Sequence, residues 1–392
     1  MASDKTSVVQ EHSVSAKASV SRIFFPNLDG LRFLAFFGVF LFHSFYTNSE
    51  SIKSSLLYHI PYAITRVGYL GVNFFFVLSG FLITYLLLSE RHVYGKIHVI
   101  AFYLRRILRI WPLYYVVVVL GFVLYPWLKQ HFGEAGFHET AKAWYYVFFL
   151  GNFNSIYNGG ATPTLELLWS VSIEEQFYLV WPLLVAAVPA PRMGWLFAGV
   201  LVLSIAFRLG NLYDHKVLDL HTFSVIGDMA LGGGAAWLCF RDDRLTAWIA
   251  QMPRWMIGVG YLAGITLIYS QSALGNLPWY LAIERLVLGM FFAFVLLEQN
   301  YAKNSIIKMS KLRFPTYWGT YTYGLYCLHY LALLAAIQLL KRLDLNNSAL
   351  GVVLGDNLVG LLLALVISWI SFNYYEKLFL KLKNRFAFIT RN

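Results

Sequence analysis

Residues 69–88 read YLGVNFFFVLSGFLITYLLL, twenty consecutive positions without one charged side chain. A helix rises about 1.5 Å per residue, so this stretch is long enough to cross the hydrocarbon core of a bilayer. The whole chain has the same character: 58% of its 392 residues are hydrophobic, 13% are charged and the mean hydropathy is +0.58. Such a chain has too little polar surface for a soluble globule. We therefore predict an all-α fold, a polytopic integral membrane helical bundle.

Similar apolar stretches follow one another with short connections, which favours one bundle over several domains. Ten of them are long enough to be spans: 31–46, 69–88, 110–127, 166–188, 195–211, 223–240, 255–271, 279–298, 317–340 and 351–373. One more apolar stretch, 143–153, is too short to cross comfortably. The transmembrane domain is predicted over residues 27–376.

The positions of lysine and arginine decide how the stretch 143–153 is placed, because cytoplasmic loops are enriched in these residues. If the stretch crossed, the basic clusters of the second half would all lie outside. If it dips in and returns, every strongly basic segment is cytoplasmic: Lys5/Lys17/Arg22, Arg91/Lys96/Arg105/Arg106/Arg109, Arg241/Arg244/Arg254, Lys303/Lys308/Lys311/Arg313 and Lys377/Lys381/Lys383/Arg385. We predict ten spans, one half-inserted segment and both termini in the cytoplasm.

The two ends of the chain are polar. Residues 1–26 are mostly polar and rich in serine at their start, which predicts a disordered cytoplasmic tail and not a cleaved secretory signal. Residues 377–392 are predicted as a basic cytoplasmic tail. The net charge of +11 lies beside apolar runs, as in a protein facing an anionic leaflet, and does not indicate a nucleic-acid binder. Cys239 and Cys327 each lie in an apolar stretch and suggest neither a disulfide framework nor a metal site.

The first span carries two ionisable residues, Arg32 and His43. Eleven helical residues place them about 16 Å apart along the axis and within about 20° of one face. Each alone could have a structural role, Arg32 by reaching headgroups and His43 by an interfacial hydrogen bond. Their shared face favours a common cavity or helix interface.

The fourth span opens with LWSVSIEEQFY, residues 168–178. Ser170 and Glu174 stand four apart on one helical face, with Trp169 beside them and Tyr178 one turn on. A carboxylate here could orient His43, so that the imidazole becomes a base for a hydroxyl proton. The alternative is a structural ion pair between a glutamate and an arginine of the bundle.

Three arginines, Arg105, Arg106 and Arg109, lie within about one turn ahead of the third span. Their guanidinium groups could hold a pyrophosphate by charge-assisted hydrogen bonds. The charge bias of cytoplasmic loops would also explain them.

Other polar residues lie inside the spans. Gly71 and Gly80 allow close helix approach, while Asn73 and Ser79 offer interhelical hydrogen bonds. His329 lies near the middle of the ninth span and could line a cavity or be structural. Two further buried charges have no partner that the sequence identifies, Asp228 and Arg285.

Five tracts, taken in order, resemble the acyltransferase 3 family, the membrane-bound bacterial O-acyltransferases of surface polysaccharides. They are LDGLR followed by His43, GVNFFFVLSGFL, FYLRRILRIWP, LWSVSIEEQFY and YGLYCLH. The chain departs from the family at 376–379, where EKLF lacks the family's proline. We expect no appended soluble domain.

The resemblance implies transfer of an acyl group, usually acetyl, from cytoplasmic acyl-CoA to a glycan hydroxyl at the outer face of the bacterial inner membrane. The acceptor would be an exopolysaccharide, an O-antigen or peptidoglycan. Catalytic roles then fall to His43, Arg32, Ser170 and Glu174. Donor binding falls to Arg105, Arg106, Arg109 and Arg32, and substrate binding to Trp169, Tyr178, Asn73 and His329. No metal is expected.

We expect the coenzyme A phosphates at the arginine cluster, the pantetheine arm along the first span and the thioester at His43. His43, oriented by Glu174, would deprotonate the acceptor for direct attack; an acyl-histidine is the less favoured variant. The alternatives are a transporter or flippase of a glycan or lipid precursor, and a non-catalytic scaffold. Against transport, the chain shows no inverted repeat.

Overall fold

The computed structural model describes residues 25–132 and 137–386. Most of the predicted N-terminal tail, residues 1–24, lies outside the described residues, as do residues 387–392 of the predicted C-terminal tail. The described part of the chain is helical throughout and contains no strand. The predicted all-α fold is confirmed.

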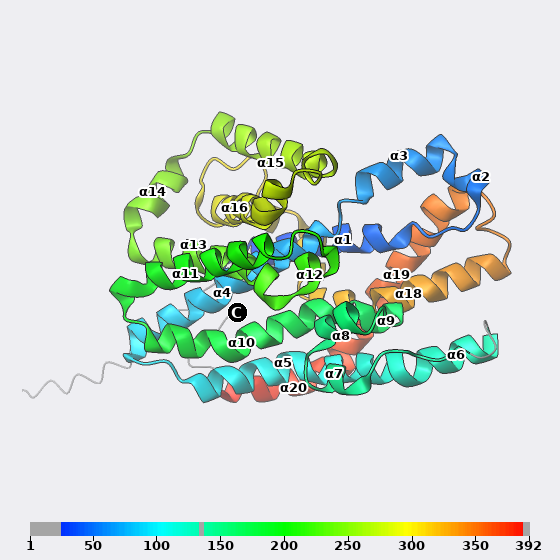
Figure 1. Ribbon diagram of the computed structural model, residues 1–392, viewed down its shortest axis with the longest axis horizontal. Coiled ribbons are helices and arrows are strands. Elements are labelled where there is room, and N and C mark those ends of the chain that lie inside the picture. Colours follow the sequence, from blue (N-terminus) through cyan, green and yellow to red (C-terminus); the bar gives the residue numbers. More distant parts are fainter. Residues whose placement is uncertain (1–24, 133–136, 387–392) are drawn as a thin grey trace, which may run out of the picture.

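Ten long helical segments of the described chain overlap the ten predicted spans, and most run along the long axis of the molecule (Figure 1). They are α1 (Leu28–Ser44), α4 (Leu70–Tyr94), α5 (Val99–Val119), α10 (Leu168–Ala187), α11 (Met193–Leu209), α13 (Thr222–Arg241), α15 (Arg254–Leu274), α16 (Pro278–Tyr301), α18 (Thr322–Arg342) and α19 (Asn357–Ile370). Two π-helical segments flank α19, η4 (Gly351–Asp356) and η5 (Ser371–Glu376).

Within the described residues, seven helical runs are long and apolar enough to cross a membrane. They are 56–94, 99–131, 190–209, 215–241, 278–301, 322–342 and 351–383. The chain is thus a multi-pass membrane protein. Helices α1, α10 and α15 are not among the seven, so the count of ten spans stays a prediction.

Shorter helices connect the long ones. They are α2 (Glu50–Lys53), α3 (Leu56–Thr65), α6 (Tyr125–Phe132), α7 (Ala143–Val147), α8 (Gly151–Tyr157), α9 (Pro163–Glu166), α12 (His215–Leu220), α14 (Asp243–Gln251), α17 (Arg313–Gly319) and α20 (Lys377–Lys383). A π-helical segment, η1 (Leu120–Leu124), joins α5 to α6. Single 3₁₀ turns occur at η2 (Ala190–Arg192), η3 (Met309–Lys311) and η6 (Asn384–Phe386).

The short apolar stretch 143–153 is not one helix. It forms α7, breaks, and resumes in α8. The break is at Phe149, whose φ of 54° lies in the left-handed region that side chains disfavour. Packing holds it there: the Phe149 ring lies 4.3 Å from that of Tyr114, centroid to centroid, and Gln176 donates a 2.8 Å hydrogen bond to its carbonyl.

Helix α4 is the central element of the bundle and packs on α1, α10, α13 and α16. Its contact with α13 is backbone to backbone. A Cβ built on Gly80 would lie 2.0 Å from the carbonyl oxygen of Met229, and one on Gly232 would lie 1.8 Å from that of Val77. The predicted close approach at Gly80 is therefore confirmed. Gly71 does the same against α1, where a Cβ would lie 2.3 Å from the Ala35 oxygen.

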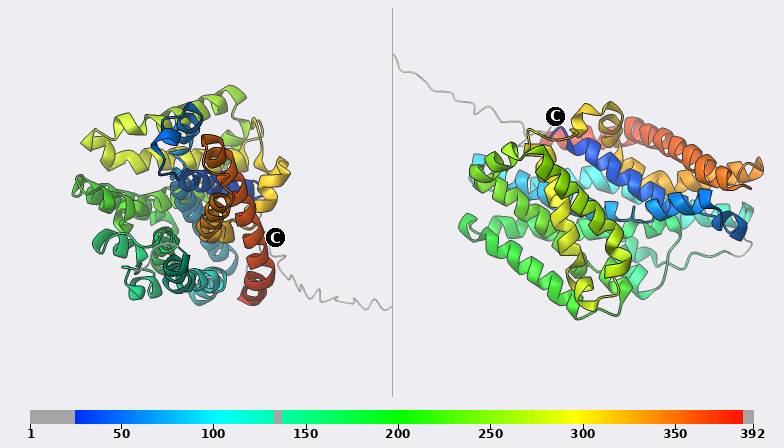
Figure 2. Two further views of the ribbon diagram at one scale, coloured as in Figure 1. Left: turned by 90° about the vertical axis from the view of Figure 1, so that its right-hand side faces the viewer. Right: turned by 90° about the horizontal axis from the view of Figure 1, so that it is seen from above.

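The last helices close the bundle on the side of α1 (Figure 2). Helix α18 packs on α19, and both contact α1. The first part of the predicted C-terminal tail is not free, because α20 lies along α5 and Arg105 donates a 2.8 Å hydrogen bond to the carbonyl of Phe386. The basic C-terminal segment thus belongs to the folded bundle as far as it is described.

The crossing of α4 and α13 gives a direct test. We expect Gly80→Ala to lower the free energy of unfolding by about 1–3 kcal/mol, because the two backbones must separate. Gly234→Ala on α13 is the matched control: its Cβ would lie 3.6 Å from the nearest atom, in ordinary contact. Unfolding in mixed detergent micelles, followed by circular dichroism, measures both. Equal stability of the two variants would contradict the close crossing.

Candidate functional site

A cavity of about 580 Å³ lies at one end of the bundle, where α1 ends and where α4 and α10 begin. This is the size of a small-molecule site. Aromatic and polar side chains from five long helices, α1, α4, α10, α16 and α18, line it, among them His43, Tyr69, Asn73, Trp169, Tyr326 and Tyr330. The predicted residues His43, Asn73 and Trp169 therefore face one common space.

His43 hydrogen-bonds to the predicted residue His329. The distance from His43 Nδ1 to His329 Nε2 is 3.1 Å, and His329 Nδ1 lies 2.7 Å from the backbone oxygen of Tyr326. A carbonyl oxygen only accepts, so His329 Nδ1 carries the proton. In a neutral His329, Nε2 is then the acceptor and His43 Nδ1 the donor. The proton of a neutral His43 is thereby fixed on Nδ1, and Nε2 is left with its lone pair.

Packing holds this histidine pair rigidly. His329 is fully buried, and its ring centroid lies 5.2 Å from that of His43 with the planes 28° apart. Phe36 and Phe40 of α1 contact the His329 ring edge to face. The backbone oxygen of Val39 is a further acceptor for the His43 ring. No side-chain hydrogen bond joins His43 Nε2 to the described residues, and His43 lines the cavity.

Glu174 makes no hydrogen bond to His43 in this structure, so the contact that the predicted orienting role requires is not present. Its carboxylate accepts hydrogen bonds from Ser79 Oγ at 2.8 Å and from the Tyr178 hydroxyl at 3.1 Å. The reason is that Glu174 lies further along α10 from the cavity than Trp169 does. Glu174 follows the cavity residue Trp169 by five positions, about 7.5 Å along α10, and it turns toward α4.

The other two predicted catalytic residues also lie outside the cavity wall. Ser170 does not line the cavity, but its hydroxyl forms a 2.6 Å hydrogen bond with the hydroxyl of Tyr326, which does. Arg32 pairs with Asp29 near the opposite end of α1. Of the residues predicted to bind substrate, Tyr178 lies at Glu174, away from the cavity.

Sequence reasoning did not identify Tyr326 and Tyr330 of the cavity wall. Tyr326 lies within the quoted tract YGLYCLH, three residues before His329 and so near the same helix face. Charged residues of the wall were also missed or left without a role: Glu166, Asp219 and Arg285.

The three predicted donor-binding arginines differ in their partners. Arg105 donates to Glu90 at 3.1 Å and to the carbonyl of Phe386, so it is engaged within the fold. Arg106 lies over the rings of Tyr178 and Phe102, and its Nε is buried without a hydrogen bond. Arg109 makes no hydrogen bond to any described residue. Two of the three guanidinium groups therefore keep donors for a ligand.

The described residues contain no group of three or more His, Cys, Asp and Glu side chains that could hold a metal ion. Both cysteines are buried and unbonded to each other.

Comparison with known families agrees with the resemblance of the motifs. The family model of acyltransferase 3, described as an acyltransferase domain, matches residues 25–372. The chain belongs to this family. No solved structure matches it significantly.

Two curated proteins that are similar to this chain are named as O-acetyltransferases. The peptidoglycan O-acetyltransferase OatA of Listeria monocytogenes is 32% identical over 199 residues, 49% of this chain and 28% of that protein. The O-acetyltransferase OatA of Staphylococcus aureus is 35% identical over 167 residues, 41% of this chain and 25% of that protein. The match thus spans between a quarter and a third of these relatives.

The different partners of the arginines predict different effects on stability. Arg105→Gln should lower the free energy of unfolding by about 1–3 kcal/mol, because buried Glu90 loses a charged donor. Arg109→Gln should lower it by less than Arg105→Gln does, since no hydrogen bond is lost and only the charge interaction with Glu376 is removed. Unfolding of the purified protein in detergent compares them. A larger loss in Arg109→Gln would contradict this assignment.

Proposed function

We propose that this chain is an O-acetyltransferase that moves an acetyl group from acetyl-CoA to a hydroxyl of a cell-wall glycan. Membership of the acyltransferase 3 family supports acyl transfer, and the names of both OatA relatives support acetyl as the group. The name of the Listeria relative supports peptidoglycan as the class of acceptor. The observation that carries the proposal is the histidine pair, which presents one basic nitrogen to the cavity.

His43 Nε2 acts as general base. It takes the proton of the acceptor hydroxyl while the oxygen attacks the thioester carbonyl carbon, and the carbon–sulfur bond then breaks. The coenzyme A thiolate leaves and recovers the proton from His43. General-base help of this kind contributes about 10²- to 10⁴-fold.

His329 positions His43 in this mechanism, in place of the carboxylate that the sequence predicted. When His43 gains a proton, its Nδ1–H still donates to His329 Nε2, which stabilises the imidazolium. The Tyr326 carbonyl keeps His329 in the accepting tautomer. Ser170 fixes the Tyr326 side chain and so the same part of α18.

The donor phosphates bind to Arg106 and Arg109, which keep unused donors. These residues belong to the first half of α5, near the end of the bundle where α4 ends, whereas His43 lies at the end where α4 begins. The extended pantetheine arm would bridge this distance past Arg32 and Glu174. We place the arginine end and both termini in the cytoplasm, in the inner membrane of a bacterium, because of the charge bias.

Removal of the base tests the chemistry. His43→Ala should lower acetyl transfer by about 10²- to 10⁴-fold and leave membrane insertion intact. The measurement compares acetyl esters of the cell-wall glycans in cells lacking the protein, with the wild-type or the variant gene returned. Normal acetylation by the variant would exclude His43 from the reaction.

His329 should act through His43, and the variants His329→Gln and His329→Leu separate this role from packing. Glutamine offers an oxygen acceptor near the position of Nε2, whereas leucine offers none. We expect kcat to fall by about 10- to 100-fold in His329→Leu, part of the general-base contribution, and to recover partly in His329→Gln. KM for acetyl-CoA should stay unchanged in both. Equal kcat values for the two variants would contradict a positioning role.

Binding of the donor can be measured without an acceptor. Acetyl-CoA at about 100 times its Kd should stabilise the purified protein by roughly 2.7 kcal/mol, seen as a rise in melting temperature. Arg109→Gln should reduce this rise at the same acetyl-CoA concentration. An unchanged melting temperature of the wild type with acetyl-CoA would contradict the proposed donor.

A further inference from the structure

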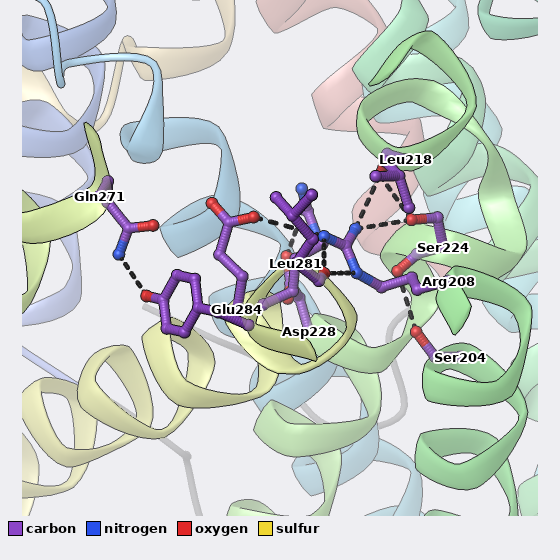
Figure 3. A network of polar contacts seen from close by, with 10 residues as sticks. Ser204, Arg208, Leu218, Ser224, Asp228, Gln271, Leu281 and Glu284 are labelled. Carbon is purple, nitrogen blue, oxygen red and sulfur yellow. Dashed lines mark hydrogen bonds and ion pairs between the residues drawn. The ribbon is translucent and has the colours of Figure 1, made fainter. Parts of the chain in front are cut away.

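Figure 3 shows a network of polar contacts between helices α11, α12, α13 and α16. It lies beside the cavity, because Asp219 of α12 and Arg285 of α16 line the cavity wall. At the centre of the network Arg208 is only 2% exposed. Its Nε and Nη2 donate to the carbonyl of Leu281 at 2.8 and 2.6 Å, and its Nη1 donates to the carbonyl of Leu218 and to Ser224 Oγ, both at 2.8 Å. Glu284 lies 3.4 Å from Nη2. The Arg208 guanidinium thus holds two backbone carbonyls, that of Leu281 on α16 and that of Leu218 on α12.

The network fixes the end of the short helix α12. Leu218 accepts from Arg208 and also, at 2.5 Å, from the Ser224 hydroxyl. From the other side Asn152 Nδ2 donates to the carbonyl of Leu220 at 3.1 Å. The residue between these two anchors is Asp219, which lines the cavity and makes no hydrogen bond to the described residues. A rigid frame thus presents an unused carboxylate to the space that His43 faces.

A second arm of the network ends at Arg285. Its Nη2 donates to Oδ2 of fully buried Asp228 at 2.5 Å, so each of these two charges is the partner that the sequence left unidentified. Arg285 also lines the cavity, and its Nε has no hydrogen bond. The network therefore reaches the cavity at two charged groups, Asp219 and Arg285.

Burying charges such as Arg285 and Asp228 within a membrane protein costs several kcal/mol, and an ion pair alone rarely repays this in stability, whereas Asp219 is exposed. A bound sugar could form hydrogen bonds with the Asp219 carboxylate and the Arg285 guanidinium. Carboxylate oxygens accept from sugar hydroxyls, a guanidinium donates to sugar oxygens, and an aromatic face packs on the apolar face of a pyranose ring. The cavity has all three, with Asp219, Arg285 and Trp169.

We propose that Asp219 and Arg285 form the subsite that holds the acceptor sugar, and that this sugar is electrically neutral. The inference rests on the proposed acetyl transfer. We expect a neutral sugar because the cavity wall carries excess negative charge. The positive Arg285 is already paired with Asp228, whereas Asp219 and Glu166 add two carboxylates to the wall. An anionic sugar would meet like charges there, which costs several kcal/mol.

The test uses membranes containing the full chain, acetyl-CoA labelled in the acetyl group, and cell-wall glycan from cells that lack this protein. After enzymatic digestion at neutral pH, mass spectrometry assigns the label either to a sugar that is neutral in the intact glycan or to one that carries a free acid group there. We expect the label on neutral sugars. Asp219→Asn should raise KM for the glycan about 10-fold, the loss of one charge-assisted hydrogen bond, with KM for acetyl-CoA unchanged.

Asp243→Asn is the matched control, because Asp243 is an exposed carboxylate at the start of α14; it should change neither KM. A melting temperature for each variant verifies folding. Label on anionic sugars, or an unchanged glycan KM in Asp219→Asn, would overturn the subsite while acetyl transfer stands. Failure of the wild type to label any glycan would instead contradict the proposed function itself.

Discussion

The hydrogen bond between His43 Nδ1 and His329 Nε2 determines what the cavity can do. It couples the first and the ninth of the long helices, and it sets which nitrogen of His43 is free. The Tyr326 carbonyl at the other end of the chain of hydrogen bonds is an obligate acceptor, so the direction of both bonds follows from one backbone oxygen. The hydrogen bond from Ser170 to the Tyr326 hydroxyl also supports this arrangement, because it holds the same part of α18.

Helix α4 shows how the bundle makes such precision possible. Gly71 lets it approach α1 and Gly80 lets it approach α13, in both cases to backbone contact. Between these glycines lie Asn73, at the cavity, and Ser79, at Glu174. A helix that is held on two sides by its own backbone cannot rotate, so these two polar side chains keep their places in the protein interior.

The sequence predicted the helices well because a span is a local property: its length and apolar composition suffice, and all ten predicted stretches overlap long helices. Of the residues that the family resemblance assigned to the site, His43, Trp169 and Asn73 line the same cavity, and each lies near an end of its helix. Glu174 was misplaced because its partner depends on the rotation of α10 against α4 and on a depth difference of about 7.5 Å. Neither quantity is local. The same holds for Asp228 and Arg285, whose pairing requires that α13 and α16 be neighbours.

A histidine is well suited to support a base in this environment. A carboxylate at the fully buried position of His329 would need a compensating positive charge or would bear a large desolvation cost away from water. A neutral imidazole held by a backbone carbonyl offers the same acceptor atom without a net charge. The reaction proposed here also needs no permanent proton acceptor, because the proton that leaves the hydroxyl returns to the departing thiolate. His43 is therefore charged only between these two transfers, and the charged residues of the bundle can be used elsewhere: Arg106 and Arg109 at the donor end, Asp219 and Arg285 at the acceptor.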